Sequence, residues 1–184
     1  MPQSFGMKSE VLHVVTGRRE SVLDITSACA EFTATAAGGG DGLLHVFVPH
    51  ATAGLALMEL GAGSDADLLS ALAEILPADD RWRHAHGSRG HGRSHVLPAL
   101  VAPFLLVPVL AGRMALGTWQ SVALVDLNVD IRTGRCACRI LHDSRAGGRL
   151  GGKRGFHIGA VWHLRGGPTQ CGLCGQAVRT RRLR

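Results

Sequence analysis

Apolar and polar residues alternate along several short stretches of the chain, which is the pattern of half-buried β-strands. The clearest stretch, residues 43–48, ends at Pro49, which has no N–H for a strand ladder. A second pattern, "VPVLAGRMALGTWQSVALVDL" at 107–127, predicts a strand, an Ala-Gly-Arg turn and a long strand paired antiparallel to the first. Short apolar runs at 8–16 and 21–26 flank a polar turn. They favour either a hairpin or a strand that leads into a helix.

Two other stretches have helical patterns. Residues 27–37 are small and apolar, and the glycine-rich turn "GGGDG" at 38–42 follows them. Further on, Ser64 is placed as an N-cap, two aspartates follow in the first turn, and apolar residues recur at helical spacing until Pro77. The sequence therefore predicts two helices, one before and one after the strand at residues 43–48.

The composition fits one globular core, because 46% of the 184 residues are hydrophobic. The most apolar run, "VLPALVAPFLLVPVLAG" from Val96, is interrupted by three prolines and is too short and kinked to span a bilayer. The first residues lack the basic and apolar regions of a secretory signal. We expect a single domain with an appendage, no association with a membrane, and a cytoplasmic location.

The formal net charge of +6 is unevenly distributed. From Arg132 to the end the chain has twelve basic residues and one acidic residue, whereas the first 131 residues carry a net charge of −5. The basic excess thus belongs to the tail and not to the part with strand and helix patterns. This distribution argues against nucleic acid as a partner.

Histidines gather in one part of the sequence. His50 follows the strand that Pro49 ends, and the loop "RWRHAHGSRGHGRSH" at 81–95 contains four more, His84, His86, His91 and His95. The simplest interpretation of this loop is a basic segment exposed to water. The alternative is that several of its histidines converge with His50 on an anion or a metal ion.

The residues around these histidines resemble a known family. The stretches "PHATAG", "RWRHAHG", "GRSHVLPAL", "VPVLAGRMALGTWQ" and "SVALVD", in this order, are similar to motifs of the YjbQ-like family over about residues 8–130. The resemblance implies an α+β fold, with a mainly antiparallel, sandwich-like β-sheet and a few flanking helices, and a homotrimer. It also implies a secondary thiamine-phosphate synthase activity, the transfer of a pyrimidine-methyl group to thiazole phosphate with release of pyrophosphate.

The family's recurrent polar positions imply a single pocket in this chain. The catalytic candidates are His50, His84, His95 and Asp65, and the ligand-binding candidates are Thr52, Glu59, Arg113, Thr118 and Gln120. The three histidines have the ligand number of a catalytic zinc site, but they equally suit a clamp for a small phosphorylated molecule. A divalent metal, zinc or magnesium, is one interpretation and an anion is the other. The alternative function is a metal- or phosphate-binding trimer without catalysis.

The histidine loop departs from the family pattern. Where the family has an acidic residue and an asparagine, this chain has Arg89 and His91. A basic residue in place of an acidic one favours an anion over a metal, unless Arg89 and Arg93 face water. No role is assigned to His86 and His91.

The motif "LGTWQ" contains one apolar and two polar candidates. Trp119 lies within an apolar pattern and is expected in the core. Successive side chains of a strand point to opposite faces, so Gln120 is expected to be the polar contact, joined by Thr118.

The tail after Asp130 no longer follows the family, although one further strand rich in Arg and Val is expected to close the sheet. Its cysteine pairs, Cys136 with Cys138 and Cys171 with Cys174, have too long a separation for a compact zinc ribbon. A G/C-rich back-translation of "DIRTGRCACR", read in another frame, gives an Arg- and Val-rich stretch. We interpret 1–130 as the YjbQ-like domain and 131–184 as a divergent basic tail, either disordered or derived from a frameshift.

Overall fold

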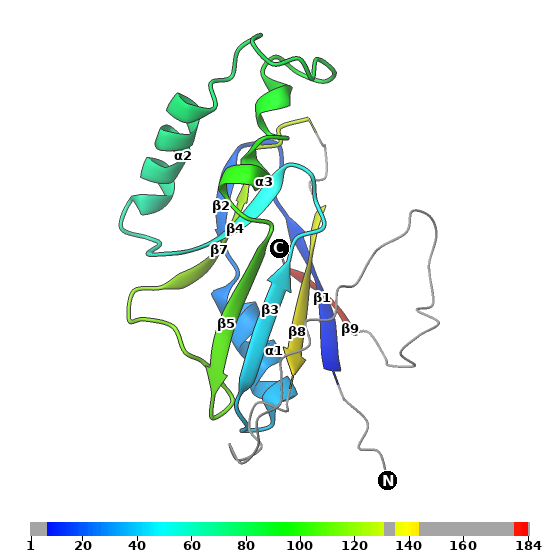
Figure 1. Ribbon diagram of the computed structural model, residues 1–184, viewed down its shortest axis with the longest axis vertical. Helices are drawn as coiled ribbons and strands as arrows, with labels where there is room; N and C mark the ends of the chain where they lie inside the picture. Colours follow the sequence, from blue (N-terminus) through cyan, green and yellow to red (C-terminus); the bar gives the residue numbers. More distant parts are fainter. Residues whose placement is uncertain (1–6, 131–134, 144–178, 184) are drawn as a thin grey trace, which may run out of the picture.

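The computed structural model describes residues 7–130, 135–143 and 179–183, which form two β-sheets with helices against them (Figure 1). The elements in chain order are β1 (Met7–Val15), β2 (Ser21–Asp24), α1 (Thr26–Ala37), β3 (Gly42–Phe47), β4 (Ala53–Met58), α2 (Ser64–Ile75), η1 (His91–Arg93), α3 (Leu97–Leu100), β5 (Phe104–Leu110), β6 (Arg113–Met114), β7 (Ser121–Asp126), β8 (Arg135–Asp143) and β9 (Arg179–Leu183). No helix of this described part is both long and apolar enough to cross a bilayer.

The larger sheet has the strand order β6-β5-β3-β8-β1-β9, and the smaller one has the order β2-β7-β4. Every strand pair is antiparallel except β1 with β9. The predicted α+β class with mainly antiparallel strands is therefore confirmed. The two apolar runs at the start, β1 and β2, belong to different sheets, so they do not form a hairpin; β2 leads into α1 instead.

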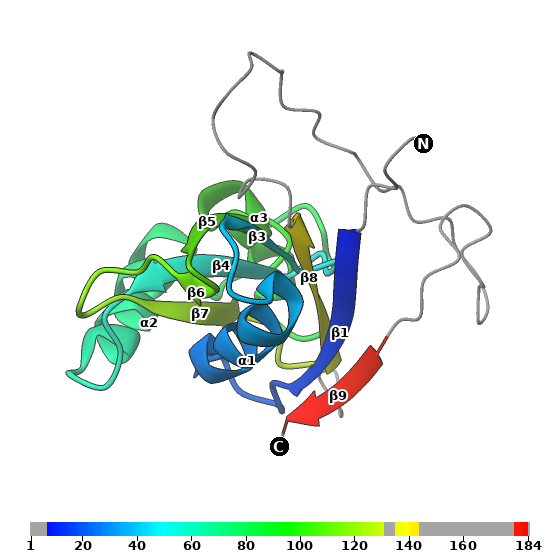
Figure 2. The same ribbon diagram turned by 90° about the horizontal axis from the view of Figure 1, so that it is seen from below.

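The core lies between the two sheets, and α1 fills part of it (Figure 2). Alternation along β7 shows why the small sheet is buried on both faces. Val122 and Leu124 pack in the main core with α1 and the large sheet, whereas Val125 packs with Leu72 of α2 on the other face. On α1 the buried face is made of three alanines, Cys29, Phe32 and Thr33. Apart from Phe32 these side chains are small, which lets the helix approach both sheets.

Both predicted helices are present, and the differences concern their ends and the strand after the Ala-Gly-Arg turn. Ser64 is the first residue of α2 and not its cap, because Gly63 with φ 97° occupies the cap position. The long strand expected after the turn is interrupted: β6 has two residues, and residues 115–120 lead to β7. Trp119 lies in that interruption and its side chain is 72% exposed, so it is not a core residue.

The tail supplies strands to the large sheet. The backbone of β8 pairs with β1 on one side and β3 on the other, which places it in the middle of the sheet as the expected closing strand. The backbone of β9 pairs with β1 at the edge. Residues 144–178, with Cys171 and Cys174, lie outside the described residues. The boundary at 130 and the frameshift origin of the tail stay predictions.

Replacing Gly54 by alanine is expected to destabilise the fold by about 1–3 kcal/mol. Gly54 is buried in β4, and a Cβ there would lie 2.1 Å from the backbone oxygen of Val101, an atom that cannot move without shifting the chain after α3. Urea unfolding measures the change. Gly117→Ala is the matched control, since the nearest atoms to its Cβ would belong to the side chain of Gln120, the closest being Oε1 at 3.3 Å. Equal stability of the two variants would contradict the argument.

Candidate metal centre

Three loops meet at the end of the sheets where β3 and β7 finish and β4 begins (Figure 1). The first contains His50 and Thr52 and connects β3 to β4. The second follows β7, and its Leu127 N–H donates to the carbonyl of Thr52 at 3.5 Å. The third is the histidine loop, residues 81–95, whose Ser88 N–H donates to the carboxylate of Asp130 at 3.1 Å. These contacts join segments that are far apart in the sequence.

The histidine loop is anchored and does not simply extend into water. Arg93 is only 4% exposed, donates to the carbonyl of Leu76 at 2.6 Å and forms an ion pair with Glu20. The indole N–H of Trp82 donates to the carbonyl of Pro77 at 2.9 Å. Arg89, by contrast, is exposed and pairs with Asp80. The two arginines that the sequence left open therefore differ: one is buried and structural, and the other faces water.

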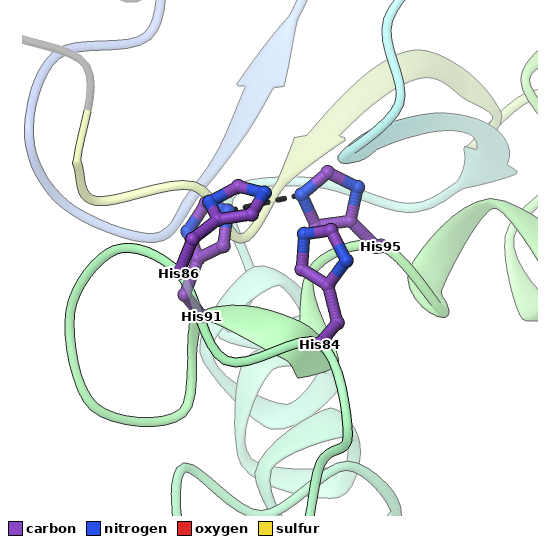
Figure 3. A group of neighbouring side chains, drawn as sticks. All are labelled: His84, His86, His91 and His95. Carbon is purple, nitrogen blue, oxygen red and sulfur yellow. Dashed lines mark hydrogen bonds between the residues drawn. The ribbon is translucent and has the colours of Figure 1, made fainter.

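Four histidines converge where this loop is held: His84, His86, His91 and His95 (Figure 3). One ring nitrogen of each lies within 4.8 Å of those of the others. This group is a candidate metal-binding site, and we call it the metal centre. The short 3-10 helix η1 and the turn after it, held by hydrogen bonds between residues three apart, curve the backbone so that His91 and His95 meet with 2.9 Å between their Nε2 atoms. His84 and His86 reach the same point from the preceding segment.

The electrostatics favour the neutral form of two of the four imidazoles. Partial desolvation and then the neighbouring imidazoles lower the pKa of His84 and of His95. A neutral imidazole has a free lone pair, which is the form that binds a metal ion. Imidazole nitrogens suit zinc, whereas magnesium prefers oxygen ligands.

Asp130 supports the metal centre from outside. Its carboxylate contacts Nδ1 of His91, which leaves the Nε2 of this ring directed at the other histidines. Hydrogen bonding by Ser88 and then the nearby His91 lower the pKa of Asp130, so it is ionised at neutral pH. A Cβ at Gly87 would lie 2.5 Å from Asp130 Oδ2, so this contact needs a glycine there. A carboxylate that fixes the ring of a metal-binding histidine is a common arrangement.

His50 and Thr52 lie beside the metal centre but outside the group of four. His50 is half-buried, and its Nδ1 is 2.8 Å from the Thr52 hydroxyl and 3.3 Å from the Thr52 backbone nitrogen. Thr52 is buried and also contacts Asp126, at 3.4 Å. His50 is close enough to His95 to contribute to the lowered pKa of that residue.

The other five predicted site residues lie at the opposite end of the strands. The register pairs Ala53 with Asp126 near the metal centre and Met58 with Ser121 at the far end. Glu59 follows the far end of β4, Asp65 begins α2, and Thr118 and Gln120 precede β7 there. In the large sheet the β3–β5 ladder runs from Phe47–Phe104, near His50, to Gly42–Val109 at the far end. Arg113 pairs with Leu110, which follows Val109, so it also lies at the far end. Gln120 Oε1 accepts the N–H of Gly117 at 2.8 Å. Within one chain the structure thus brings together His50, Thr52, His84 and His95 only.

Sequence reasoning left out three residues of this region: His86, His91 and Asp130. For His91 and His95 the signal is the four-residue spacing, which is that of two ligands on one helical face. The His84-x-His86 spacing is a weaker signal. No local pattern identifies Asp130, because its partner is about forty residues away in the sequence.

Comparisons with known proteins agree with this fold. A family model described as UPF0047 protein YjbQ-like matches residues 10–143, a range that includes β8. A UPF0047 protein of Mycobacterium tuberculosis is 56% identical over 124 residues, covering 67% of this chain and 90% of the relative. The UPF0047 protein YugU of Bacillus subtilis is 28% identical over 136 residues, covering 72% and 98%.

Two crystal structures have the same architecture. A YbjQ-like protein of unknown function from Sulfolobus solfataricus matches with a TM-score of 0.67 and 24% identity, over 75% of this chain and 99% of that one. The hypothetical protein APE1520 from Aeropyrum pernix matches with a TM-score of 0.63 and 30% identity, over 74% and 97%. The chain therefore belongs to the YjbQ-like family, UPF0047.

Proposed function

We propose that the protein binds a divalent metal ion, zinc in the first place, at the metal centre and uses it to hold a small phosphorylated molecule. The observation that carries the proposal is the convergence of four histidine nitrogens within 4.8 Å, one of them on a ring contacted by Asp130. Structural zinc sites are enclosed, whereas sites that act on a ligand keep a position open. A phosphate oxygen would be the fifth ligand of the zinc ion, or the fourth where three of the histidines bind it. His84 and His86 are exposed, so this position can be reached from solvent.

Thiamine-phosphate synthase activity is the catalytic form of this proposal. In that reaction the bond between the pyrimidine methylene carbon and the pyrophosphate oxygen breaks, and a bond from the thiazole nitrogen to the same carbon forms. A metal ion would stabilise the negative charge that develops on the leaving pyrophosphate. The four imidazoles support a site of this type, because they place nitrogen ligands around one point, and His50 lies near one of them, His95.

A binding protein without turnover is the second candidate. The two carboxylates expected to hold a metal or accept a proton, Glu59 and Asp65, lie at the far end of β4 in this chain. Asp130 is nearer, but its oxygens are bonded to Ser88 and His91. None of these three carboxylates is therefore free beside the metal centre to accept a proton. This observation favours a protein that binds a metal and a phosphate compound without catalysing a reaction.

One experiment tests the function and separates the two candidates. The full-length protein is purified without added metal, its metal content is measured, and the zinc-loaded form is assayed for pyrophosphate release from the pyrimidine diphosphate and thiazole phosphate. We expect one zinc per chain. Product above that of a His84→Ala variant supports the synthase, and zinc binding without product supports the binding protein. A wild-type chain that takes up no zinc would overturn the proposal.

Removing the charge of Asp130 is expected to weaken zinc binding about tenfold, in the range usual for a group that orients a ligand. Asp130→Asn keeps an oxygen for the N–H of Ser88 and loses the charge beside His91. Competition with a chromophoric chelator measures the affinity. Asp80→Asn is the control, because Asp80 is an exposed acidic residue of the same region that pairs with Arg89. Equal losses in the two variants would mean that general charge, and not the contact with His91, is responsible.

A homotrimer is the proposed assembly, and the large sheet offers a surface for it. Phe104, Leu106 and Leu110 of β5 are exposed on one face. The register places Phe47 and His45 of β3 beside the first two, on the same face. An exposed apolar face of this kind is a frequent site of association. Light scattering on the full-length protein is expected to give the mass of three chains, and a monomer would contradict the proposal.

A further inference from the structure

The hydrogen bonds of His50 determine which of its ring nitrogens carries a proton. The backbone N–H of Thr52 donates to Nδ1, at 3.3 Å between the nitrogens. A backbone amide can only donate, so Nδ1 must present its lone pair to it. The hydroxyl of Thr52 lies 2.8 Å from the same atom and 3.4 Å from the carboxylate of Asp126, and we assign its single proton to the shorter contact, with Nδ1. In the neutral ring the single proton is therefore on Nε2, the atom on the side of the ring away from Thr52.

This arrangement differs from that of a metal ligand. A histidine that binds a metal through Nε2 usually donates its Nδ1–H to a carboxylate or a carbonyl, as His91 can do with Asp130. The Nδ1 of His50 faces a donor instead. The chemistry left to Nε2–H is donation of a hydrogen bond.

The position of His50 is held by buried groups. Thr52 is 2% exposed, and its neighbour Asp126 is 3% exposed and accepts the N–H of Asn128 at 2.9 Å. The side chain of Asn128 in turn accepts the N–H of Asp130, also at 2.9 Å. Asp130 contacts His91, and the N–H of Leu127, next to Asn128, donates to the carbonyl of Thr52 at 3.5 Å, so hydrogen bonds connect the His50 loop to the metal centre. His50 is thereby fixed beside the four histidines.

The arginines of the histidine loop leave room for such a donor. Arg81 pairs with Asp79, Arg89 with Asp80 and Arg93 with Glu20. Three of the four arginines between residues 81 and 95 are therefore committed to carboxylates. Arg83, the fourth, is exposed next to His84, so Arg83 and the nearby His50 are the groups left to donate to an anionic ligand at the metal centre.

We propose that His50 is not a ligand of the metal but donates a hydrogen bond from Nε2–H to an oxygen of a phosphate group bound at the metal centre. This inference rests on the proposed metal site. The metal would bind one phosphate oxygen and His50 would donate to another. Together they would select a tetrahedral oxyanion over a ligand with one non-hydrogen atom, such as water or chloride.

Inorganic phosphate is the probe. The full-length protein is loaded with cobalt in place of zinc, and phosphate is titrated while the visible cobalt spectrum is recorded. In His50→Ala we expect one metal per chain with wild-type affinity and a phosphate affinity at least about tenfold weaker, the loss of a hydrogen bond to a charged group. His50→Gln is expected to recover most of it, because a carboxamide N–H can donate. His45→Gln, a histidine of β3 outside the metal centre, is the control for a general effect.

The outcomes separate the two proposals. A wild-type chain without metal would overturn the proposed function and the phosphate site with it. Loss of metal in His50→Ala would show that His50 is a ligand, and unchanged phosphate affinity would show that it is no donor; either overturns the inference alone. Nitrogen-15 NMR of the metal-free protein gives an independent readout of the tautomer. The proton is expected on Nε2 of His50, and a proton on Nδ1 would overturn the inference whatever the metal does.

Discussion

Replacing His95 by alanine is expected to lower the affinity for zinc by roughly two orders of magnitude. Four-ligand zinc sites are worth about 10–16 kcal/mol at neutral pH, so one ligand accounts for roughly 3 kcal/mol, about a hundredfold in affinity. His95 has a ring nitrogen in the group of four and lies 2.9 Å from the corresponding atom of His91. Its lowered pKa keeps it neutral at neutral pH and available to the metal. Competition with a chelator of known affinity measures the change.

The control for this variant is His45→Gln. His45 is also a half-buried histidine with a lowered pKa, but it lies on β3 beside Phe47 and Phe104. We expect its zinc affinity to equal that of the wild type. Retention of one tightly bound zinc per chain in His95→Ala would exclude His95 as a ligand. Circular dichroism of the metal-free variant checks that loss of metal is not loss of fold.

Replacing Arg93 by leucine is expected to reduce the free energy of unfolding by about 3–5 kcal/mol, the cost of removing one partner of a buried ion pair. Its guanidinium donates to the carbonyl of Leu76 and pairs with Glu20, which has 29% side-chain exposure. Without Arg93 that carbonyl loses its donor and Glu20 loses its counter-charge. The leucine cannot replace either interaction. Urea unfolding of the metal-free protein measures the loss.

Arg89→Leu is the matched control for Arg93. Its partner is Asp80, and both side chains are more than two-thirds exposed, so the pair contributes less than about 1 kcal/mol. In the double variant Glu20→Leu with Arg93→Leu we expect part of the stability to return, because no charge is left without its partner. If Arg89→Leu costs as much as Arg93→Leu, burial of the pair is not the cause.

The Arg93 variant also reports on how the metal centre is built. Arg93 is the last residue of η1, the turn that brings His91 and His95 together, and it fastens this turn to the end of α2. Arg93→Leu is therefore expected to weaken zinc binding as well, although no atom of Arg93 belongs to the group of four.

Much of the secondary structure follows from the sequence alone. α1, α2 and β3 were predicted at nearly their observed positions because each depends on a repeat of apolar residues over a few turns or pleats and on a nearby glycine or proline. The resemblance of the motifs to the YjbQ-like family was confirmed, and so was the α+β class. The sequence also showed that histidines are concentrated between residues 84 and 95. These properties are local, because each depends only on residues that are close together in the sequence.

Which residues share a site was decided by tertiary structure. His50 and Gln120 both belong to motifs that resemble the family, but β4 and β7 each span six residues, and their register puts the two motifs at opposite ends. Asp130 and His91 meet because β7 and the histidine loop end at the same place. The sequence left open whether Arg93 faces water, and its contact with Glu20, from a segment more than seventy residues away, decides that it is buried. Strand pairing and loop packing set such distances, and neither is encoded in the spacing of residues along one segment.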